Sequence, residues 1–232
     1  MFVVVEGVDG VGKSTVIDRL ADFLPQDVDI AYTREPTDGP HGRLIRSGTV
    51  EDPDALVGLF TADRKHHVAD VIAPALTECE ITVCDRYFYS TAVYQHTPAR
   101  PYSTIVAEQQ ERFPTPDLLI LLDAPPEYTA ARLGDSQEIN DQSAADVVNA
   151  RRKRYYAILA AHVAEGRYGV AIDASRPLED VCKTVADAVW SAYCGYTARD
   201  RARTWLASAK MHEAPLKADP ATYLQAAQAI GS

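Results

Sequence analysis

Residues 2–15 read Phe2-Val-Val-Val-Glu-Gly-Val-Asp-Gly-Val-Gly-Lys-Ser-Thr15, an apolar run followed at once by a glycine-rich segment. Residues 7–14 fit GxxxxGK[ST], the pattern of a loop between a strand and a helix whose backbone N–H groups hold phosphate oxygens. In such a loop Lys13 supplies charge to the β and γ phosphates of a nucleotide, and the Ser14 hydroxyl is a ligand for Mg²⁺. The predicted nucleotide-binding residues are Gly7, Gly10, Gly12, Lys13, Ser14 and Thr15.

Four more short apolar runs follow, separated by segments long enough for helices. They are residues 29–32, 81–84, 118–122 and 168–172. Nearly continuous apolar strands separated by helices are typical of a parallel sheet covered on both faces, so the pattern predicts a doubly wound α/β fold. Asp52 followed by Pro53 marks a helix start. We expect this helix to pass Phe60 and Arg64 and to bend near Pro74.

The composition is that of an ordinary globular protein, with 47% hydrophobic and 24% charged residues among 232. The pattern of strands favours one main domain over residues 1–194 and a helical extension of unknown role over residues 195–232. A formal net charge of −10 argues against broad attraction to nucleic acid or to an anionic membrane. The first residues lack the basic start and the long apolar segment of a signal peptide, no run reaches 18 apolar residues, and the four cysteines lack CxxC or zinc spacing. We therefore expect a cytoplasmic protein with reduced thiols.

Asp85 closes the apolar run 81–84, and Arg86 follows it directly. In a chain with a phosphate-binding loop, an acid at the end of a buried strand holds Mg²⁺ directly or through water. An arginine beside it, at the carboxyl edge of the sheet, is placed to bind a second phosphate. The histidines show no metal-site spacing and no evident carboxylate partner. Ser14 and Asp85 are therefore the predicted metal ligands.

Several separated motifs resemble those of the thymidylate kinases, a family of P-loop nucleoside monophosphate kinases. They are Glu6-Gly-Val-Asp-Gly-Val-Gly-Lys-Ser-Thr15, Thr33-Arg-Glu-Pro36, Leu59-Phe-Thr-Ala-Asp-Arg64, Asp85-Arg-Tyr87, Ser90-Thr-Ala-Val-Tyr-Gln95, Pro116-Asp-Leu118 and Leu122-Asp123. Their order and spacing are similar to the family's from residue 1 to about residue 194. The resemblance implies a five-stranded parallel sheet, a lid over about residues 134–148 and a homodimer. It also implies transfer of the γ-phosphate of ATP to dTMP, for dTTP synthesis, with Mg²⁺ as cofactor.

The resemblance also implies roles for single residues. Phe60 stacks on the thymine and Arg64, four residues further along the same helix face, bonds a base carbonyl. Tyr94 crowds the 2′ position of the sugar, and Arg132 and Ser175 lie on the adenine side. The implied catalytic residues are Lys13, Arg86 and Asp9. The implied acceptor-binding residues are Asp9, Arg34, Arg46, Phe60, Arg64, Arg86, Ser90, Thr91, Tyr94 and Gln95.

One departure from the family concerns the charge that phosphoryl transfer requires. Members of the family place an arginine in the P-loop or in the lid, but this chain has Gly10 in the P-loop and neither Lys nor Arg over residues 134–148. An arginine delivered to the transferred group contributes about 10³-fold or more. The nearest cations are Arg151, Arg152, Lys153 and Arg154. Our hypothesis is that Arg151 or Arg152 replaces the missing arginine, and we take Arg152 as a predicted catalytic residue.

Two other functions remain open from the sequence. One is a related P-loop kinase that acts on another deoxynucleotide or on a deoxynucleoside. The arginines predicted at the acceptor phosphate favour an acceptor that already carries phosphate. The other is a catalytically weak nucleotide-binding protein, for which the arginine-free segment is the support.

Overall fold

The computed structural model describes residues 1–133 and 142–209 of the chain, and a parallel sheet forms its centre. The strands are β1 (Phe2–Glu6), β2 (Ile30–Arg34), β3 (Ile81–Asp85), β4 (Leu118–Asp123) and β5 (Tyr168–Asp173). They lie in the order β2-β3-β1-β4-β5. The predicted doubly wound α/β fold with five parallel strands is confirmed.

The central strand β1 pairs with β3 on one side and with β4 on the other. Val4 lies opposite Cys84 of β3 and Leu119 of β4. All five residues of β1 are buried, because helices cover both faces of the sheet. Full burial of an aliphatic side chain stabilises a fold by roughly 1.5–3 kcal/mol, so these strands hold the phosphate-binding loop on a rigid base.

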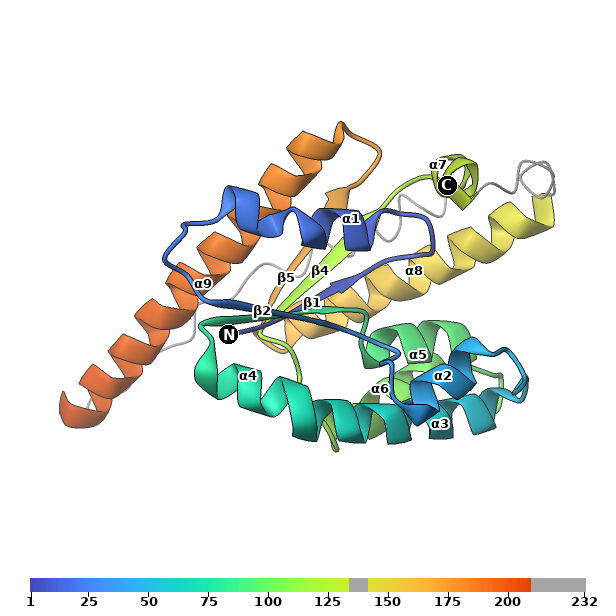
Figure 1. Cartoon of the computed structure of the whole chain (residues 1–232), viewed down its shortest axis with the longest axis horizontal. Helices are drawn as coiled ribbons and strands as arrows, with labels where there is room; N and C mark the ends of the chain where they lie inside the picture. The colour runs from blue at the N-terminus through green and yellow to red at the C-terminus, as the bar shows by residue number, and fades with distance from the viewer. Residues whose placement is uncertain (134–141, 210–232) are drawn as a thin grey trace.

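Helices lie on both sides of the sheet (Figure 1). The described helices are α1 (Lys13–Asp18), α2 (Pro40–Arg46), α3 (Pro53–His67), α4 (Ala73–Glu78), α5 (Phe88–Gln95), α6 (Tyr102–Gln110), α7 (Pro126–Leu133), α8 (Gln142–Ala164) and α9 (Leu178–Ala209). A 3₁₀ turn at Leu20–Phe23 follows α1. Helices α1 and α9 cover one face, whereas α8 and α5 pack together on the other. None of these described helices is both long and apolar enough to cross a membrane.

The long helix α3 begins as predicted. The Asp52 carboxylate accepts a hydrogen bond from the N–H of Ala55 at 2.8 Å, and Pro53 occupies the first turn. A π-helical turn at Val68–Ile72 separates α3 from α4, just before Pro74. Because proline has no N–H to donate to the preceding turn, the regular bonding pattern is interrupted there. A widened π-helical turn therefore lies next to the position where the bend is predicted.

Strand β2 covers residues 30–34 rather than the predicted 29–32. Thr33 and Arg34 pair with Cys84 and Asp85 of β3, although both side chains are polar. The side chains of this edge strand are only partly buried, so the residues at its end need not be apolar and the sequence does not show where the strand ends. The backbone partners on β3 therefore decide where β2 ends.

Two predicted boundaries near the end of the domain also differ. Residues 142–148, predicted as part of the lid, are the first turns of α8, and the rest of that segment, residues 134–141, lies outside the described residues. Helix α9 continues through Gly195 to Ala209 without a break after residue 194. A Cβ atom at Gly195 would lie 2.6 Å from the Tyr168 hydroxyl, so glycine permits a close approach there. The remaining extension, residues 210–232, lies outside the described residues.

Candidate functional site

The loop between β1 and α1 encloses the predicted nucleotide site. Gly10 and Gly12 have φ angles of 75° and 102°, in the left-handed region that glycine adopts without strain. The Lys13 ammonium donates to the carbonyls of Gly7 and Val8, each at 3.0 Å. A cavity of about 400 Å³ opens above the loop. It is lined by Asp9, Gly10, Gly12, Lys13, Ser14, Thr15, Asp85, Arg86 and Arg132.

The charge state of Lys13 makes this loop receptive to an anion. Burial lowers the pKa of Lys13 to about 8, and the nearby Arg86 charge acts in the same direction. Asp85, Asp9 and Glu6 oppose this shift. A phosphate group carries negative charge and favours the protonated amine in the same way as these acids. The loop is therefore suited to a polyanionic ligand.

Ser14 and Asp85 form the predicted metal-binding pair. The Ser14 hydroxyl donates to Asp85 Oδ2 at 2.7 Å, and Asp85 Oδ1 is buried without a hydrogen-bond partner. Proteins usually hold Mg²⁺ by one or two oxygens together with substrate phosphates, so this pair fits the ion without a larger cluster. Among the described residues no group of three or more His, Cys, Asp or Glu has metal-binding geometry.

A second cavity, of about 190 Å³, lies on the other side of Asp9 and Arg86. Its walls carry an aromatic ring, Phe60, together with several hydroxyl, amide and charged groups. The lining residues are Asp9, Glu35, Pro36, Phe60, Arg86, Tyr87, Ser90, Tyr94 and Gln95. The structure thus brings together six of the predicted acceptor residues, and Asp9 and Arg86 line both cavities.

A small network fixes the two residues shared by the cavities. The Arg86 guanidinium donates to Asp9, to the Ser90 hydroxyl at 3.0 Å and to the Gly7 carbonyl at 3.3 Å. The Tyr94 hydroxyl donates to the other Asp9 oxygen at 2.9 Å. Burial alone would raise the pKa of Asp9, but Arg86 and the Tyr94 hydroxyl bring it below its ordinary value. Arg86 has φ 65°, a conformation that costs a non-glycine residue roughly 1–3 kcal/mol and so depends on these contacts.

Arg64 and Thr91 do not line the second cavity, which we call the acceptor cavity because six predicted acceptor residues line it. Arg64 is completely buried. Its Nε atom lies 2.9 Å from Glu35 Oε2, and its Nη atoms donate to Gln109 Oε1 at 2.7 Å and to Thr91 Oγ1 at 3.0 Å. Glu35 itself lines the cavity. The predicted base-reading residues are therefore adjacent to the acceptor cavity, with the Arg64 guanidinium held by other side chains.

His67 belongs to the same buried network, although the sequence shows no carboxylate partner for it. Its Nδ1 atom lies 3.1 Å from Glu35 Oε1, and its Nε2 atom contacts the Thr33 hydroxyl. Glu35 is 32 positions away in the chain, too far for any local spacing rule. The one available signal is that Arg64 and His67 are three residues apart and so share a helix face.

Arg34, Arg46 and Ser175 are also absent from the lining of both cavities, as are Gly7, Arg64, Thr91 and Arg152. Arg34 and Arg46 pair with Asp38, at 3.2 and 2.9 Å, in exposed positions. The Ser175 N–H and hydroxyl both donate to Asp173, at 2.9 and 2.6 Å, in the turn after β5. The roles implied for these residues stay predictions.

The two arginines proposed for phosphoryl transfer have different surroundings on α8. Arg152 donates to both carboxylate oxygens of Asp123, at 2.6 and 2.7 Å, and to Asn149 at 3.0 Å. The Arg151 guanidinium lies over the Tyr94 ring, 4.4 Å from its centroid. Arg152 is thus held at the end of β4, whereas Arg151 faces the network around Asp9.

Comparison with known proteins identifies the family. Residues 5–185 match the family model described as thymidylate kinase. The chain belongs to the thymidylate kinase family. It is 38% identical to a probable thymidylate kinase of Pyrobaculum calidifontis over 189 residues, which cover 80% of this chain and 93% of that protein. It is 39% identical to a probable thymidylate kinase of Pyrococcus horikoshii, over 57% of this chain and 69% of that protein. It is also 39% identical to a thymidylate kinase of Xanthomonas campestris pv. campestris, over 57% of this chain and 60% of that protein.

In this member of the thymidylate kinase family, a buried carboxylate joins the phosphate-binding loop to two helices. Glu6 accepts from the N–H groups of Tyr87 and Ser90, at 2.9 and 3.1 Å, from the Ser90 hydroxyl at 2.6 Å and from the Tyr155 hydroxyl at 3.3 Å. Burial raises the pKa of Glu6, while Arg86 and these hydrogen bonds oppose the shift. Glu6 lies inside the first motif, but partners 81 to 149 positions away cannot be read from the sequence.

Proposed function

We propose that this chain transfers the γ-phosphate of ATP to dTMP, giving dTDP and ADP for dTTP synthesis. The observation that carries this proposal is the wall of Asp9 and Arg86 shared by two cavities. One cavity is formed by a phosphate-binding loop, and the other combines an aromatic ring with polar groups suited to a nucleotide base and sugar. A donor and an acceptor bound in them meet at that wall. Family membership and the names of the relatives support dTMP as the acceptor.

On the donor side, the P-loop backbone from Gly7 to Thr15 surrounds the ATP phosphates and Lys13 adds charge. Arg132 and Ser175 are proposed for the adenine side. Ser14 and Asp85 are proposed to hold Mg²⁺, which supplies positive charge to the β and γ phosphates when bound. The buried, unpartnered Asp85 Oδ1 supports this assignment.

On the acceptor side, Phe60 offers an aromatic face for thymine, and the polar groups behind and beside it are proposed to read the base. These are Arg64, Ser90, Thr91 and Gln95. Tyr94 lies against the sugar position, where its ring excludes a 2′-hydroxyl, and Asp9 accepts from the 3′-hydroxyl. Arg86, with Arg34 and Arg46, is proposed to bind the acceptor phosphate, a task that suits the guanidinium fork.

During transfer, an oxygen of the dTMP phosphate attacks the γ-phosphorus and forms a new P–O bond. The bond from that phosphorus to the β–γ bridging oxygen breaks, and its electron pair leaves with ADP. Such a reaction depends mainly on positioning and electrostatic stabilisation. Lys13 and Arg86 supply both at the place where the cavities meet.

The test is a steady-state assay with ATP and Mg²⁺ that compares dTMP with dUMP, dCMP, dGMP, UMP, AMP and thymidine. We expect dTMP to have the highest kcat/KM, and Phe60→Ala to raise its KM by about tenfold or more because a stacked ring is lost. Lys183→Ala, at an exposed position of α9 that lines neither cavity, serves as the control. Equal turnover of dTMP and thymidine, or no dTDP from wild-type protein, would contradict the proposal.

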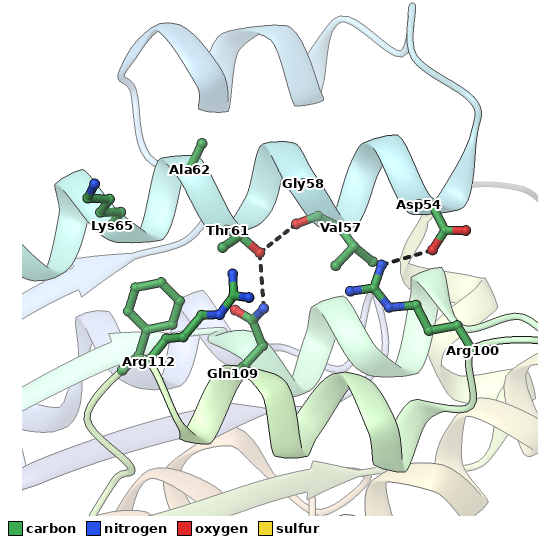
Figure 2. Close-up of a pocket in the computed structure, with 10 residues that line it drawn as sticks. Asp54, Val57, Gly58, Thr61, Ala62, Lys65, Arg100, Gln109 and Arg112 are labelled. Atoms are coloured by element: carbon green, nitrogen blue, oxygen red, sulfur yellow. Dashed lines mark hydrogen bonds and ion pairs between the residues drawn. The ribbon is translucent and has the colours of Figure 1, made fainter.

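The active form is proposed to be a homodimer, with α3 at the interface. A groove of about 620 Å³ runs between α3 and α6 (Figure 2). Its α3 wall carries the small residues Gly58 and Ala62, beside Thr61, to which Gln109 of α6 donates at 3.0 Å. Asp54 and Arg100 pair at one end, 2.9 Å apart. Small residues flanked by opposite charges suit close contact with a second copy.

Sedimentation equilibrium tests this assembly. We expect wild-type protein at twice the chain mass of 25.4 kDa. Nothing lies within 4 Å of a Cβ added at Gly58, so Gly58→Glu puts a charge into the groove without a clash inside one chain. This variant should dissociate, while Gly58→Ala remains a dimer. A monomeric wild type, or a dimeric Gly58→Glu, would refute the interface.

The use of ATP and dTMP, both intracellular metabolites, also favours the cytoplasm as the proposed location.

A further inference from the structure

Phosphoryl transfer needs positive charge at the transferred group, and two cations that line the P-loop cavity, Lys13 and Arg86, are already bound to protein atoms. Lys13 donates to the carbonyls of Gly7 and Val8. Arg86 is bound to Asp9, Ser90 and Gly7. The sequence offers no Lys or Arg at position 10 or over residues 134–148. A cation from another element would add to the charge that Lys13 and Arg86 supply.

Helix α8 presents Arg151 to the region between the cavities. Its guanidinium lies 4.4 Å from the centroid of the Tyr94 ring, and the Tyr94 hydroxyl donates to Asp9 at 2.9 Å. The Arg151 charge is close enough to Asp9 to contribute to the lowered pKa of that carboxyl. Arg151 itself lines neither cavity, but Tyr94, on which it is stacked, lines one of them beside Asp9, and Asp9 lines both, so Arg151 lies next to the wall that the two cavities share.

The two residues that follow Arg151 on α8 have different surroundings. Successive helical residues point about 100° apart, so adjacent side chains face different surroundings. Arg152 is bound to Asp123 and Asn149, and Lys153 is exposed. No carboxylate among the described residues forms an ion pair with Arg151, whose guanidinium is held by the aromatic ring instead. A cation stacked on a ring is pre-positioned and still able to donate to a phosphate.

Resting on the proposed function, we propose that Arg151 is a catalytic residue that donates to the γ-phosphoryl group while the dTMP oxygen bonds to its phosphorus. It stabilises the charge on that group as the bond to the β–γ bridging oxygen breaks and the electron pair leaves with ADP. The Tyr94 ring positions Arg151 for this contact. Arg152 is then a structural residue that fixes α8 to the end of β4.

Single-turnover kinetics of Arg151→Ala, with saturating ATP and dTMP, tests the proposal. We expect the transfer rate to fall by about 10²-fold or more, while the Kd values for ATP and dTMP change by less than about threefold, because the contact forms mainly in the transition state. Arg151→Lys should retain part of the rate, and free guanidinium should rescue Arg151→Ala. Lys153→Ala, which removes the same charge from an exposed neighbour, is the matched control and should match wild type.

The outcomes separate this proposal from the one on which it rests. If wild-type protein forms no dTDP, the proposed function fails and Arg151 has no transfer to assist. If wild-type protein forms dTDP but Arg151→Ala stays within threefold of its rate, only the role of Arg151 is overturned. Loss of dTMP binding without loss of transfer rate at saturation also overturns it, since this would make Arg151 a binding residue.

Discussion

Replacement of Glu35 by glutamine is expected to destabilise the protein strongly. The Arg64 guanidinium is fully buried and has Glu35 as its charged partner at 2.9 Å. It is surrounded by the rings of Tyr87, Phe88 and Phe113, whose centroids lie 5.2 to 5.9 Å from its Cζ atom. Glutamine keeps the size of the side chain but removes its charge and turns an N–H donor toward other donors. A buried ion pair that loses one partner costs about 3–5 kcal/mol, because the remaining charge stays buried and uncompensated.

Urea unfolding at pH 7, with both proteins at one concentration, measures this loss. A chain of this size loses about 2–4 °C in Tm per kcal/mol, so a thermal scan should show a drop of about 6–20 °C. Asp38→Asn is the matched control, since the Arg34–Asp38 pair is exposed and is worth at most about 1 kcal/mol. The double variant Glu35→Leu/Arg64→Met, which removes both charges, should be more stable than Glu35→Gln. A free energy of unfolding within about 1 kcal/mol of wild type for Glu35→Gln would refute this reasoning.

Four more predictions concern Lys13, Asp85 and Gly12. Lys13 has a pKa of about 8 in the folded protein, so kcat/KM for ATP should fall as the pH rises above about 8, and a flat profile to about pH 9.5 would contradict this. Between about pH 8 and 10.5, Lys13 binds more protons in the unfolded chain than in the folded protein, so the free energy of unfolding should rise with pH. Urea titrations over this pH range measure the rise, and Lys13→Met should abolish it. Asp85→Asn should raise the Mg²⁺ concentration for half-maximal activity by about tenfold or more, and an unchanged Mg²⁺ titration would exclude Asp85 as a ligand. Gly12→Ala should weaken ATP binding by about tenfold or more in calorimetry, because Gly12 has φ 102° and an added Cβ would lie 2.7 Å from the Arg132 side chain. Gly166→Ala is the control for backbone strain alone, because Gly166 has φ 81° but no atom within 4 Å of an added Cβ.

The parts of the protein that sequence predicts best are those whose physical cause is local. The phosphate-binding loop is predictable because its glycines, lysine and serine act within eight consecutive positions. Buried strands such as β4 are predictable because both of their faces are covered and nearly all of their residues are apolar. The end of β2 is not, because Thr33 and Arg34 belong to the sheet only through their pairing with β3.

The same distinction applies to the site. Phe60, Tyr94 and Asp9 were predicted from their motifs, and the structure places them around one cavity. The environments of Arg64 and Arg151 depend on partners far away in the chain. Arg64 meets Glu35 from 29 positions away, and Arg151 meets Tyr94 across the interface between α8 and α5. No local pattern distinguishes Arg151 from Arg152, because the packing of α8 alone decides which of them faces the cavities.

The shared carboxylate of Glu6 also limits how this sequence can change over time. Its carboxylate oxygens accept hydrogen bonds from the backbone N–H groups of residues 87 and 90, from the Ser90 hydroxyl and from the Tyr155 hydroxyl. A substitution of Glu6 leaves several buried hydrogen-bond donors without an acceptor at once. A tolerated substitution at position 6 therefore requires simultaneous substitutions at positions 90 and 155. Transplanting the phosphate-binding loop into another scaffold means moving all three positions together, although they belong to three separate elements of the chain.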